Sequence, residues 1–146
     1  MKQLLHSKTK IISKMLRSLG LVFVLGSAIT QVYGDVTIYS TGNVARGQTG
    51  HFRIHSDEPI GFRGLYVNFS LSGTAIPGVD YVALVSPAYI PHCIFDSCGV
   101  LIPVTTLPDV RGLFPPQAYS VVVKLLPGIG YFVGEPSSAQ MLIVPQ

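Results

Sequence analysis

The stretch SLSGTAIPGVDY, Ser70 to Tyr81, lies between two apolar runs and is rich in residues that form turns. Two glycines, a proline and the single aspartate Asp80 interrupt any continuous helix or strand there. The run before it, LYVNFSL at 65–71, alternates apolar and polar side chains with the period of a strand that is buried on one face. The apolar members of that run are expected to face inward; they are Leu65, Val67, Phe69 and Leu71.

The same alternation recurs on both sides of this stretch. HFRIH at 51–55 places Phe52 and Ile54 on one face, and YSVVVKL at 119–125 alternates in the same way. No segment after residue 34 has a sustained helical period, and glycine and proline separate the apolar runs. The sequence therefore predicts an all-β fold, an antiparallel β-sandwich. Its strands, about seven, are expected at 36–40, 51–55, 65–71, 88–91, 100–107, 119–125 and 139–144.

Positive charge is concentrated in the first 34 residues. The 146-residue chain has ten Lys and Arg and seven Asp and Glu, but five of the basic residues and no acid lie before residue 35. An apolar run of about eleven residues at 19–29 follows this basic start, and it is short for a bilayer span of about 20 residues. We interpret residues 1–34 as a signal peptide, cleaved after Gly34 or Ala28, with an uncleaved anchor as the alternative. Residues 35–146 would then form one secreted or periplasmic domain that touches a membrane only through an uncleaved leader.

The two cysteines of the chain, Cys93 and Cys98, lie close together in PHCIFDSCG. A disulfide between them fits an oxidising compartment and would shape the tip of a loop. The alternative is a metal site, but two thiolates need further ligands, and His92 is the only neighbour of a suitable type. The sequence favours the disulfide.

Three motifs in order, SGTAIPGVDY, TTLPDV and GYFVGEPSSAQMLIV, resemble those of the Calx-beta domain. The resemblance covers most of residues 36–144. It implies an immunoglobulin-like antiparallel sandwich of about seven strands. It also implies calcium bound by loops at one end of the sandwich, where the acidic ligands are present.

Only part of that calcium site is present in this sequence. Asp80 and Asp109 match two of the acidic positions that the resemblance implies, whereas Arg46 stands where the first glutamate would be. Leu113, Phe114 and Gln117 occupy the region of a glutamate pair. Because calcium takes six to eight oxygen ligands, we expect a weak or lost site and no other cofactor.

The resemblance also implies that Arg46, Asp80 and Asp109 meet at one end of the sandwich. We expect the Arg46 guanidinium to take the place of the cation, in a partly exposed pair that contributes about 1 kcal/mol or less. Asp80 is expected mainly to hold its turn by accepting local backbone N–H bonds. Residual calcium binding is the alternative.

Features typical of enzymes are absent from this sequence. There is no G-x-S-x-G serine motif and no glycine-rich loop opening a helix. His51 and His55 share the outward face of one strand about 13 Å apart, too far to bind one ion together. Without the leader the chain is acidic, which argues against nucleic-acid binding. We predict a protein that is not an enzyme.

The loops 56–64, 92–98 and 127–138 should converge at the end opposite Asp80. Aromatic and apolar side chains at loop tips are typical of a recognition surface, although some of them could fold back and cap the core. We therefore expect an exported module for binding or adhesion to a protein or glycan partner, with a calcium-binding structural domain as the alternative. The apolar residues of these loops are Ile60, Phe62, Ile94, Phe95, Ile129, Tyr131 and Phe132.

Overall fold

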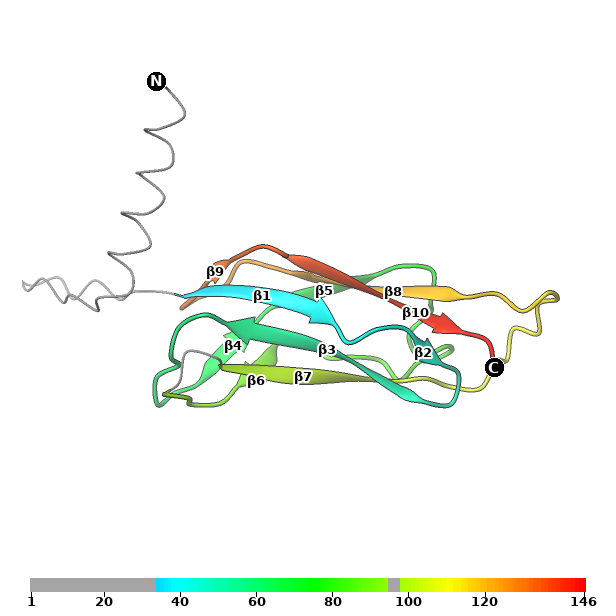
Figure 1. Ribbon diagram of the computed structural model, residues 1–146, viewed down its shortest axis with the longest axis horizontal. Helices are drawn as coiled ribbons and strands as arrows, with labels where there is room; N and C mark the ends of the chain where they lie inside the picture. Colours follow the sequence, from blue (N-terminus) through cyan, green and yellow to red (C-terminus); the bar gives the residue numbers. More distant parts are fainter. Residues whose placement is uncertain (1–33, 95–97) are drawn as a thin grey trace, which may run out of the picture. The chain divides into compact units, whose positions relative to one another are not determined.

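The structure, a computed structural model, describes residues 34–94 and 98–146, and every regular element among them is a strand (Figure 1). Within these residues no helix has the length and apolar character needed to cross a membrane. Residues 1–33 of the predicted leader, and Phe95, lie outside the described residues. The strands are β1 (Asp35–Ser40), β2 (Val44–Ala45), β3 (Thr49–Ser56), β4 (Leu65–Val67), β5 (Phe69–Ser72), β6 (Ala88–Ile90), β7 (Cys98–Thr105), β8 (Tyr119–Leu125), β9 (Phe132–Val133) and β10 (Ser138–Val144).

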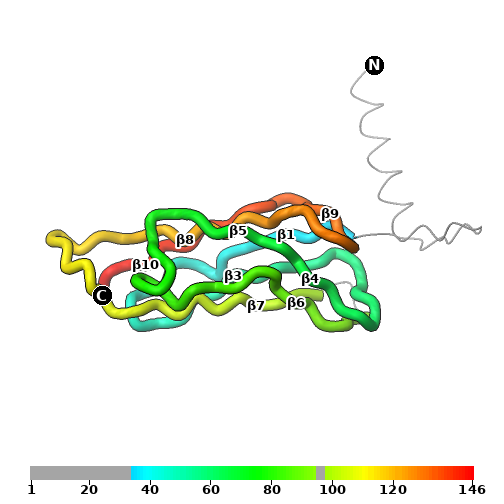
Figure 2. Tube along the Cα trace, turned by 180° about the vertical axis from the view of Figure 1, so that it is seen from behind, coloured from blue at the N-terminus to red at the C-terminus, as the bar shows by residue number. Residues whose placement is uncertain are grey.

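The strands form two four-stranded sheets that face each other and a separate two-stranded ribbon. One sheet has the order β7-β3-β1-β9 and the other has the order β2-β10-β8-β5, while β4 pairs with β6. Figure 2 shows from behind how β5 lies next to β8 while β4 turns towards β6 and β7. The all-β sandwich expected from the alternating runs is confirmed, and its strand order has the immunoglobulin-like arrangement.

Each of the seven predicted strands is present, with two differences. The run at 65–71 is divided at Asn68 into β4 and β5, so one half pairs with β6 and the other with β8. Two extra strands of two residues each, β2 and β9, pair in parallel with β10 and β1, whereas the other pairings are antiparallel.

The chain passes from one sheet to the other between β1 and β2. β1 pairs with β3, and after a short crossing the chain continues as β2 beside β10 in the opposite sheet. Gly42 lies in the crossing with φ of 122°, a backbone conformation that residues with a side chain rarely adopt. The start of the sandwich is therefore bonded to both of its layers.

The core lies between the sheets and consists of the side chains that the alternation placed inward. Val67 and Phe69 are buried, Leu65 and Leu71 are partly buried against the core, and Tyr66 and Ser70 face outward. Each fully buried aliphatic or aromatic side chain contributes about 1.5–3 kcal/mol relative to exposure. Residues Tyr33–Gln146 form a compact unit with this core. Its largest fully buried side chains are Tyr81, Phe52, Ile38, Ile54, Ile90, Leu125, Met141 and Ile143.

Candidate functional site

Asp80 closes the turn that follows β5, as its place in the glycine- and proline-rich stretch predicted. The N–H of Ile76 donates to Oδ2 of Asp80 at 2.7 Å, and the N–H of Asp80 donates to the Ile76 carbonyl at 2.8 Å. Gly78, with φ of 78°, donates to the Tyr81 carbonyl at 2.8 Å. The local N–H bond expected for the Asp80 carboxylate is confirmed.

Arg46, the residue that follows β2, links the end of this strand to the turn. Its Nη2 lies 2.8 Å from Oδ1 of Asp80 and 3.7 Å from Oδ1 of Asp109, and its Nη1 donates to the Leu107 carbonyl at 3.1 Å. The prediction that Arg46, Asp80 and Asp109 meet is confirmed. The prediction of a partly exposed pair is wrong, because the Arg46 and Asp80 side chains are only 8% and 1% exposed.

A second arginine, which the sequence analysis did not identify, completes the site. Nη2 of Arg111 forms an ion pair with Oδ2 of Asp80 and donates to the Thr74 carbonyl at 3.3 Å. Its guanidinium carbon lies 4.1 Å from the centre of the Tyr119 ring, and that of Arg46 lies 5.4 Å from it. Its charge could have marked Arg111 as a candidate in the sequence, because it stands two residues after Asp109 in a domain with few basic residues.

The electrostatics of this cluster disfavour a calcium ion at Asp80. Burial raises the pKa of Asp80, but the Ile76 N–H and the guanidinium groups of Arg46 and Arg111 lower it more. The pKa therefore lies below the usual range, and the carboxylate is ionised with both oxygens bound to arginines. Among the described residues no group of three or more His, Cys, Asp or Glu side chains could hold a metal ion.

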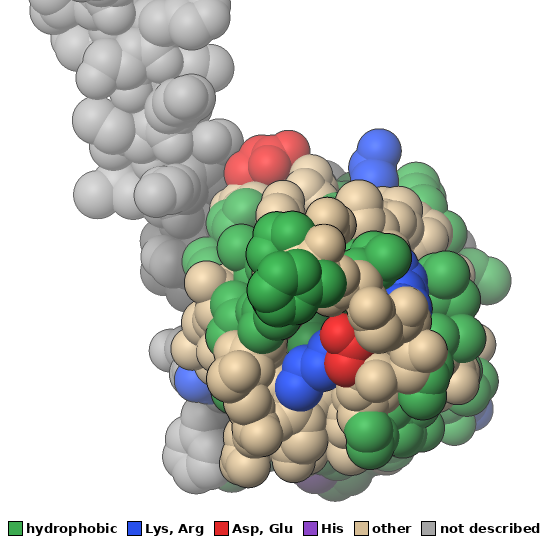
Figure 3. Space-filling view, turned by 90° about the vertical axis from the view of Figure 1, so that its right-hand side faces the viewer, with side chains coloured by type: hydrophobic (Ala, Val, Ile, Leu, Met, Phe, Trp, Pro, Cys, Tyr) green, Lys and Arg blue, Asp and Glu red, His purple; other side chains and the backbone are tan. Residues whose placement is uncertain are grey.

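An open hollow lies beside this cluster, next to the 107–118 loop. Figure 3 looks onto this end and shows basic and acidic side chains side by side in a hollow with hydrophobic side chains around it. Leu113 and Phe114, in the region where the resemblance implied glutamates, are exposed. The hollow, of about 410 Å³, is lined by Arg46, Gly47, Pro108, Asp109, Pro116, Pro145 and Gln146.

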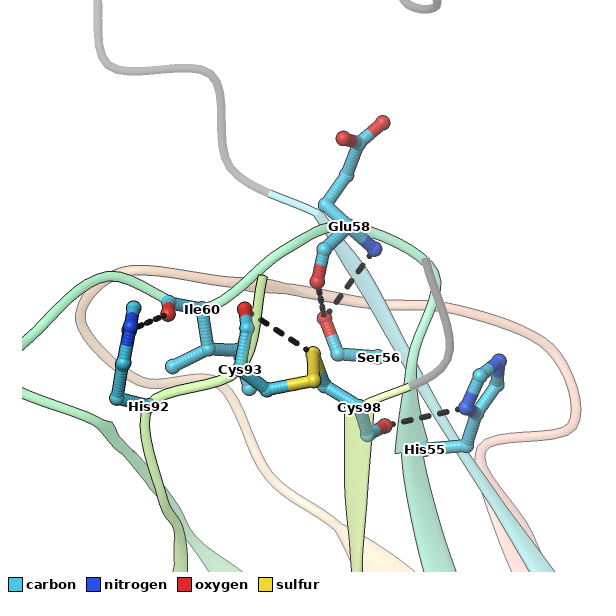
Figure 4. Close-up of a disulfide and its surroundings, with 7 residues drawn as sticks. All are labelled: His55, Ser56, Glu58, Ile60, His92, Cys93 and Cys98. Carbon is cyan, nitrogen blue, oxygen red and sulfur yellow. Dashed lines mark hydrogen bonds between the residues drawn. A yellow bond between two sulfur atoms is a disulfide. The ribbon is translucent and has the colours of Figure 1, made fainter. Parts of the chain in front are cut away.

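The opposite end carries the disulfide (Figure 4). Cys93 and Cys98 are bonded with their Cα atoms 5.8 Å apart, as the sequence predicted. Ile60 and Cys93 exchange backbone hydrogen bonds of 2.8 and 3.1 Å, and Nδ1 of His92 lies 2.8 Å from the Ile60 carbonyl oxygen. These bonds hold the loop after β3 against the segment after β6.

The apolar loop residues divide into two groups. Phe62, Ile94 and Ile129 are largely exposed, and Phe132 is more than half exposed. Ile60 is instead buried, which is the capping alternative that the sequence left open.

Tyr131 also differs from the expectation of a binding residue. Its side chain is buried, its hydroxyl donates to the Leu126 carbonyl at 2.6 Å, and the hydroxyl oxygen accepts from the Asn68 N–H at 3.0 Å. Burial raises the pKa of Tyr131. Tyr131 therefore satisfies the backbone where β4 and β5 separate, and it adds no exposed surface to the loop end.

The described parts of the three loops lie at one end of the sandwich, the end where β1 begins, away from the C-terminus (Figure 1). The exposed residues Phe62, Ile94 and Ile129 come one from each loop. We call this group, with Phe132, the apolar loop end.

Comparison with known proteins adds no assignment. No protein-family model matches the chain, and no curated protein matches it.

Proposed function

We propose that residues 35–146 form an exported, non-enzymatic module for binding or adhesion, which contacts a protein or glycan partner through the apolar loop end. The observation that carries this proposal is the exposure of Phe62 and Ile129, 91% and 93%, on two loops at the same end of the sandwich (Figure 1). Large apolar side chains gathered in this way are typical of the centres of interaction sites. The module would act outside the cytoplasm, behind the leader at 1–34.

The disulfide supports both parts of the proposal. A Cys93–Cys98 bond is stable in the oxidising compartments to which an exported protein is sent. It also holds one of the loop tips, so less conformational entropy is lost when a partner orders that tip.

The motifs that resemble a Calx-beta domain support a module of that type with a degenerate calcium site. Arg46 and Arg111 occupy both oxygens of Asp80, the residue that the resemblance marks as a calcium ligand. We propose that these arginines replace the ion and that the module works without calcium. A calcium-dependent domain is the alternative that the measurements below distinguish.

The test compares variants of matched exposure at the two ends of the sandwich. Oxidised residues 35–146 are applied to arrays of purified extracellular proteins and of glycans, with Phe62→Ala and Ile129→Asp as loop-end variants. Phe114→Ala and Val110→Asp are the controls, since Phe114 is 95% exposed and Val110 is also largely exposed.

We expect the two loop-end variants to weaken binding at least about tenfold and the two controls to leave it unchanged. The opposite pattern, loss of binding in Phe114→Ala with full binding in Phe62→Ala, would move the site to the end that carries Asp80. Absence of binding to every array member would contradict the proposal.

A further inference from the structure

Four aromatic rings are exposed along the β4–β6 ribbon and the turn beside it. Tyr66 and Tyr89 are directly opposite each other on the two strands, with ring centres 4.9 Å apart and ring planes tilted by 44°. Phe62 and His92 stack with centres 4.5 Å apart and planes within 24°. We call these four side chains the aromatic strip.

Tyr89, one of the four rings of the strip, packs against the backbone of the neighbouring turn. Gly64 has φ of 68°, and a methyl group at this position would collide with the ring of Tyr89, so the tyrosine packs directly on the bare backbone. The Gly64 N–H donates to the Gly61 carbonyl at 2.9 Å and closes the turn. Because the Tyr89 ring is already packed before a ligand arrives, its ordering on binding costs little side-chain entropy.

Polar groups accompany the rings. The ribbon strands themselves carry no charged residue, and the two tyrosines offer hydroxyl groups that can donate and accept hydrogen bonds. Nδ1 of His92 faces the Ile60 carbonyl and therefore carries a proton, which makes Nε2 an acceptor in the neutral ring. Arg63, between Phe62 and Gly64, is exposed and adds donors.

This combination suits a sugar chain better than a protein surface. Phe and Tyr side chains bury about 150–250 Å² each, and Tyr66 and Tyr89 are only 61% and 43% exposed, so the strip offers less than the roughly 800 Å² that each partner buries in a stable protein interface. A pyranose with equatorial hydroxyls has a flat C–H face that packs on a ring. Its hydroxyls point outward in the plane of the sugar, where polar groups beside the ring can reach them.

We propose that the aromatic strip is a binding site for a neutral glycan built of β-linked, gluco-configured pyranoses. This inference rests on the proposed function and names the partner class of that module. The sugar rings lie against Tyr66 and Tyr89, and the chain continues over the Phe62–His92 stack.

A purely structural role is the competing explanation, because cross-strand tyrosine pairs also stabilise a ribbon. Chemical shifts separate the two roles without any substitution. Addition of cellohexaose or chitohexaose to oxidised, isotope-labelled residues 35–146 is expected to shift the resonances of Tyr66, Tyr89 and their strand neighbours. A tyrosine pair that only stabilises the ribbon would give no such shifts.

Variants then locate the site by calorimetric titration with the same two oligosaccharides. Tyr66→Ala and Tyr89→Ala are expected to weaken binding about tenfold, and Tyr66→Phe, which keeps the ring, less than that. Tyr39→Ala is the matched control, since Tyr39 is 48% exposed against 43% for Tyr89 and lies on β1. It should bind as tightly as the unchanged protein.

Two results would overturn this inference, and they differ in what they say of the proposed function. If neither oligosaccharide binds while a purified protein is captured through Phe62 and Ile129, the strip is not a glycan site and the binding module stands. If the oligosaccharides bind with full affinity in Tyr66→Ala and Tyr89→Ala, the sugar site lies elsewhere.

Discussion

Nη2 of Arg46 lies 2.8 Å from Oδ1 of Asp80, and the side chains of both residues are buried. The pair joins the end of β2 to the turn after β5, 34 positions apart in sequence. Oδ2 of the same carboxylate pairs with Arg111. One aspartate therefore fixes two other segments of the chain at this end of the sandwich.

Removing the shared carboxylate should be strongly destabilising. Asp80→Ala leaves two guanidinium groups without their acid in a largely buried place, and we expect a loss of about 3–5 kcal/mol in the free energy of unfolding. Asp109→Ala is the control, since its side chain is 30% exposed, and it should cost about 1 kcal/mol or less. Urea unfolding of both variants checks the difference, and equal losses would contradict it.

Calcium should leave the stability of the domain unchanged. A ligand that binds only the folded state raises the midpoint of thermal unfolding, but the oxygens of Asp80 are already bound to Arg46 and Arg111. We expect the same midpoint in chelator and in millimolar calcium. A rise with calcium that Asp80→Ala abolishes would show that the ion site persists.

Stability should fall in acid because of Asp80. Its pKa is lowered in the folded state relative to the ordinary 3.8, so the unfolded chain takes up the proton more readily as the pH drops. The contribution of Asp80 is therefore fully present above about pH 5 and is lost as the pH falls through the folded pKa. Unfolding free energies measured from pH 6 to pH 2 should decline in this range, and more steeply than in Asp80→Asn.

Tyr131 should matter for folding more than for partner binding. Tyr131→Phe removes the hydroxyl that donates to Leu126 and accepts from Asn68, leaving backbone groups unpaired, and we expect a loss of about 1–3 kcal/mol. Thermal unfolding measures this loss. The affinity of the folded variant for its partner should be unchanged. Weakened affinity without a loss of stability would show that Tyr131 contributes to partner binding.

The disulfide should contribute modestly to stability. Closing so short a loop restricts the unfolded chain by about 2 kcal/mol on the chain-entropy estimate. Replacement of both Cys93 and Cys98 by serine should lower the unfolding free energy by about this amount. We expect the two ends of the sandwich to contribute independently, so that Asp109→Ala lowers the unfolding free energy by the same amount with and without the disulfide. A clearly different loss in the protein without the disulfide would contradict this independence.

The strands and their inward faces were predictable because a period of two residues maps directly onto the two faces of a strand. The meeting of Arg46 with Asp80 was predictable from an arginine standing at an acidic position of the resembled family. The burial of that pair was not, because it depends on how the 107–118 loop covers it.

Other features were hidden because they depend on contacts distant in sequence. The sequence around Asn68 does not indicate that its N–H donates to the hydroxyl of Tyr131, 63 positions later. It also does not indicate that the predicted strand divides at Asn68. Arg111 carried a charge signal, but its partner Asp80 lies 31 positions earlier. Side chains that complete a site from a loop are the hardest to place, since loops have no period.

The parallel pairing of β2 with β10 has a mechanical consequence. Val44 and Ala45 lie beside Ile143 and Val144 with both strands running in the same direction. Tension applied between the first strand and Gln146 would slide these two strands past each other, so their hydrogen bonds would resist together instead of opening one at a time. A sandwich loaded in this direction would yield by shear, which requires several hydrogen bonds to break at once.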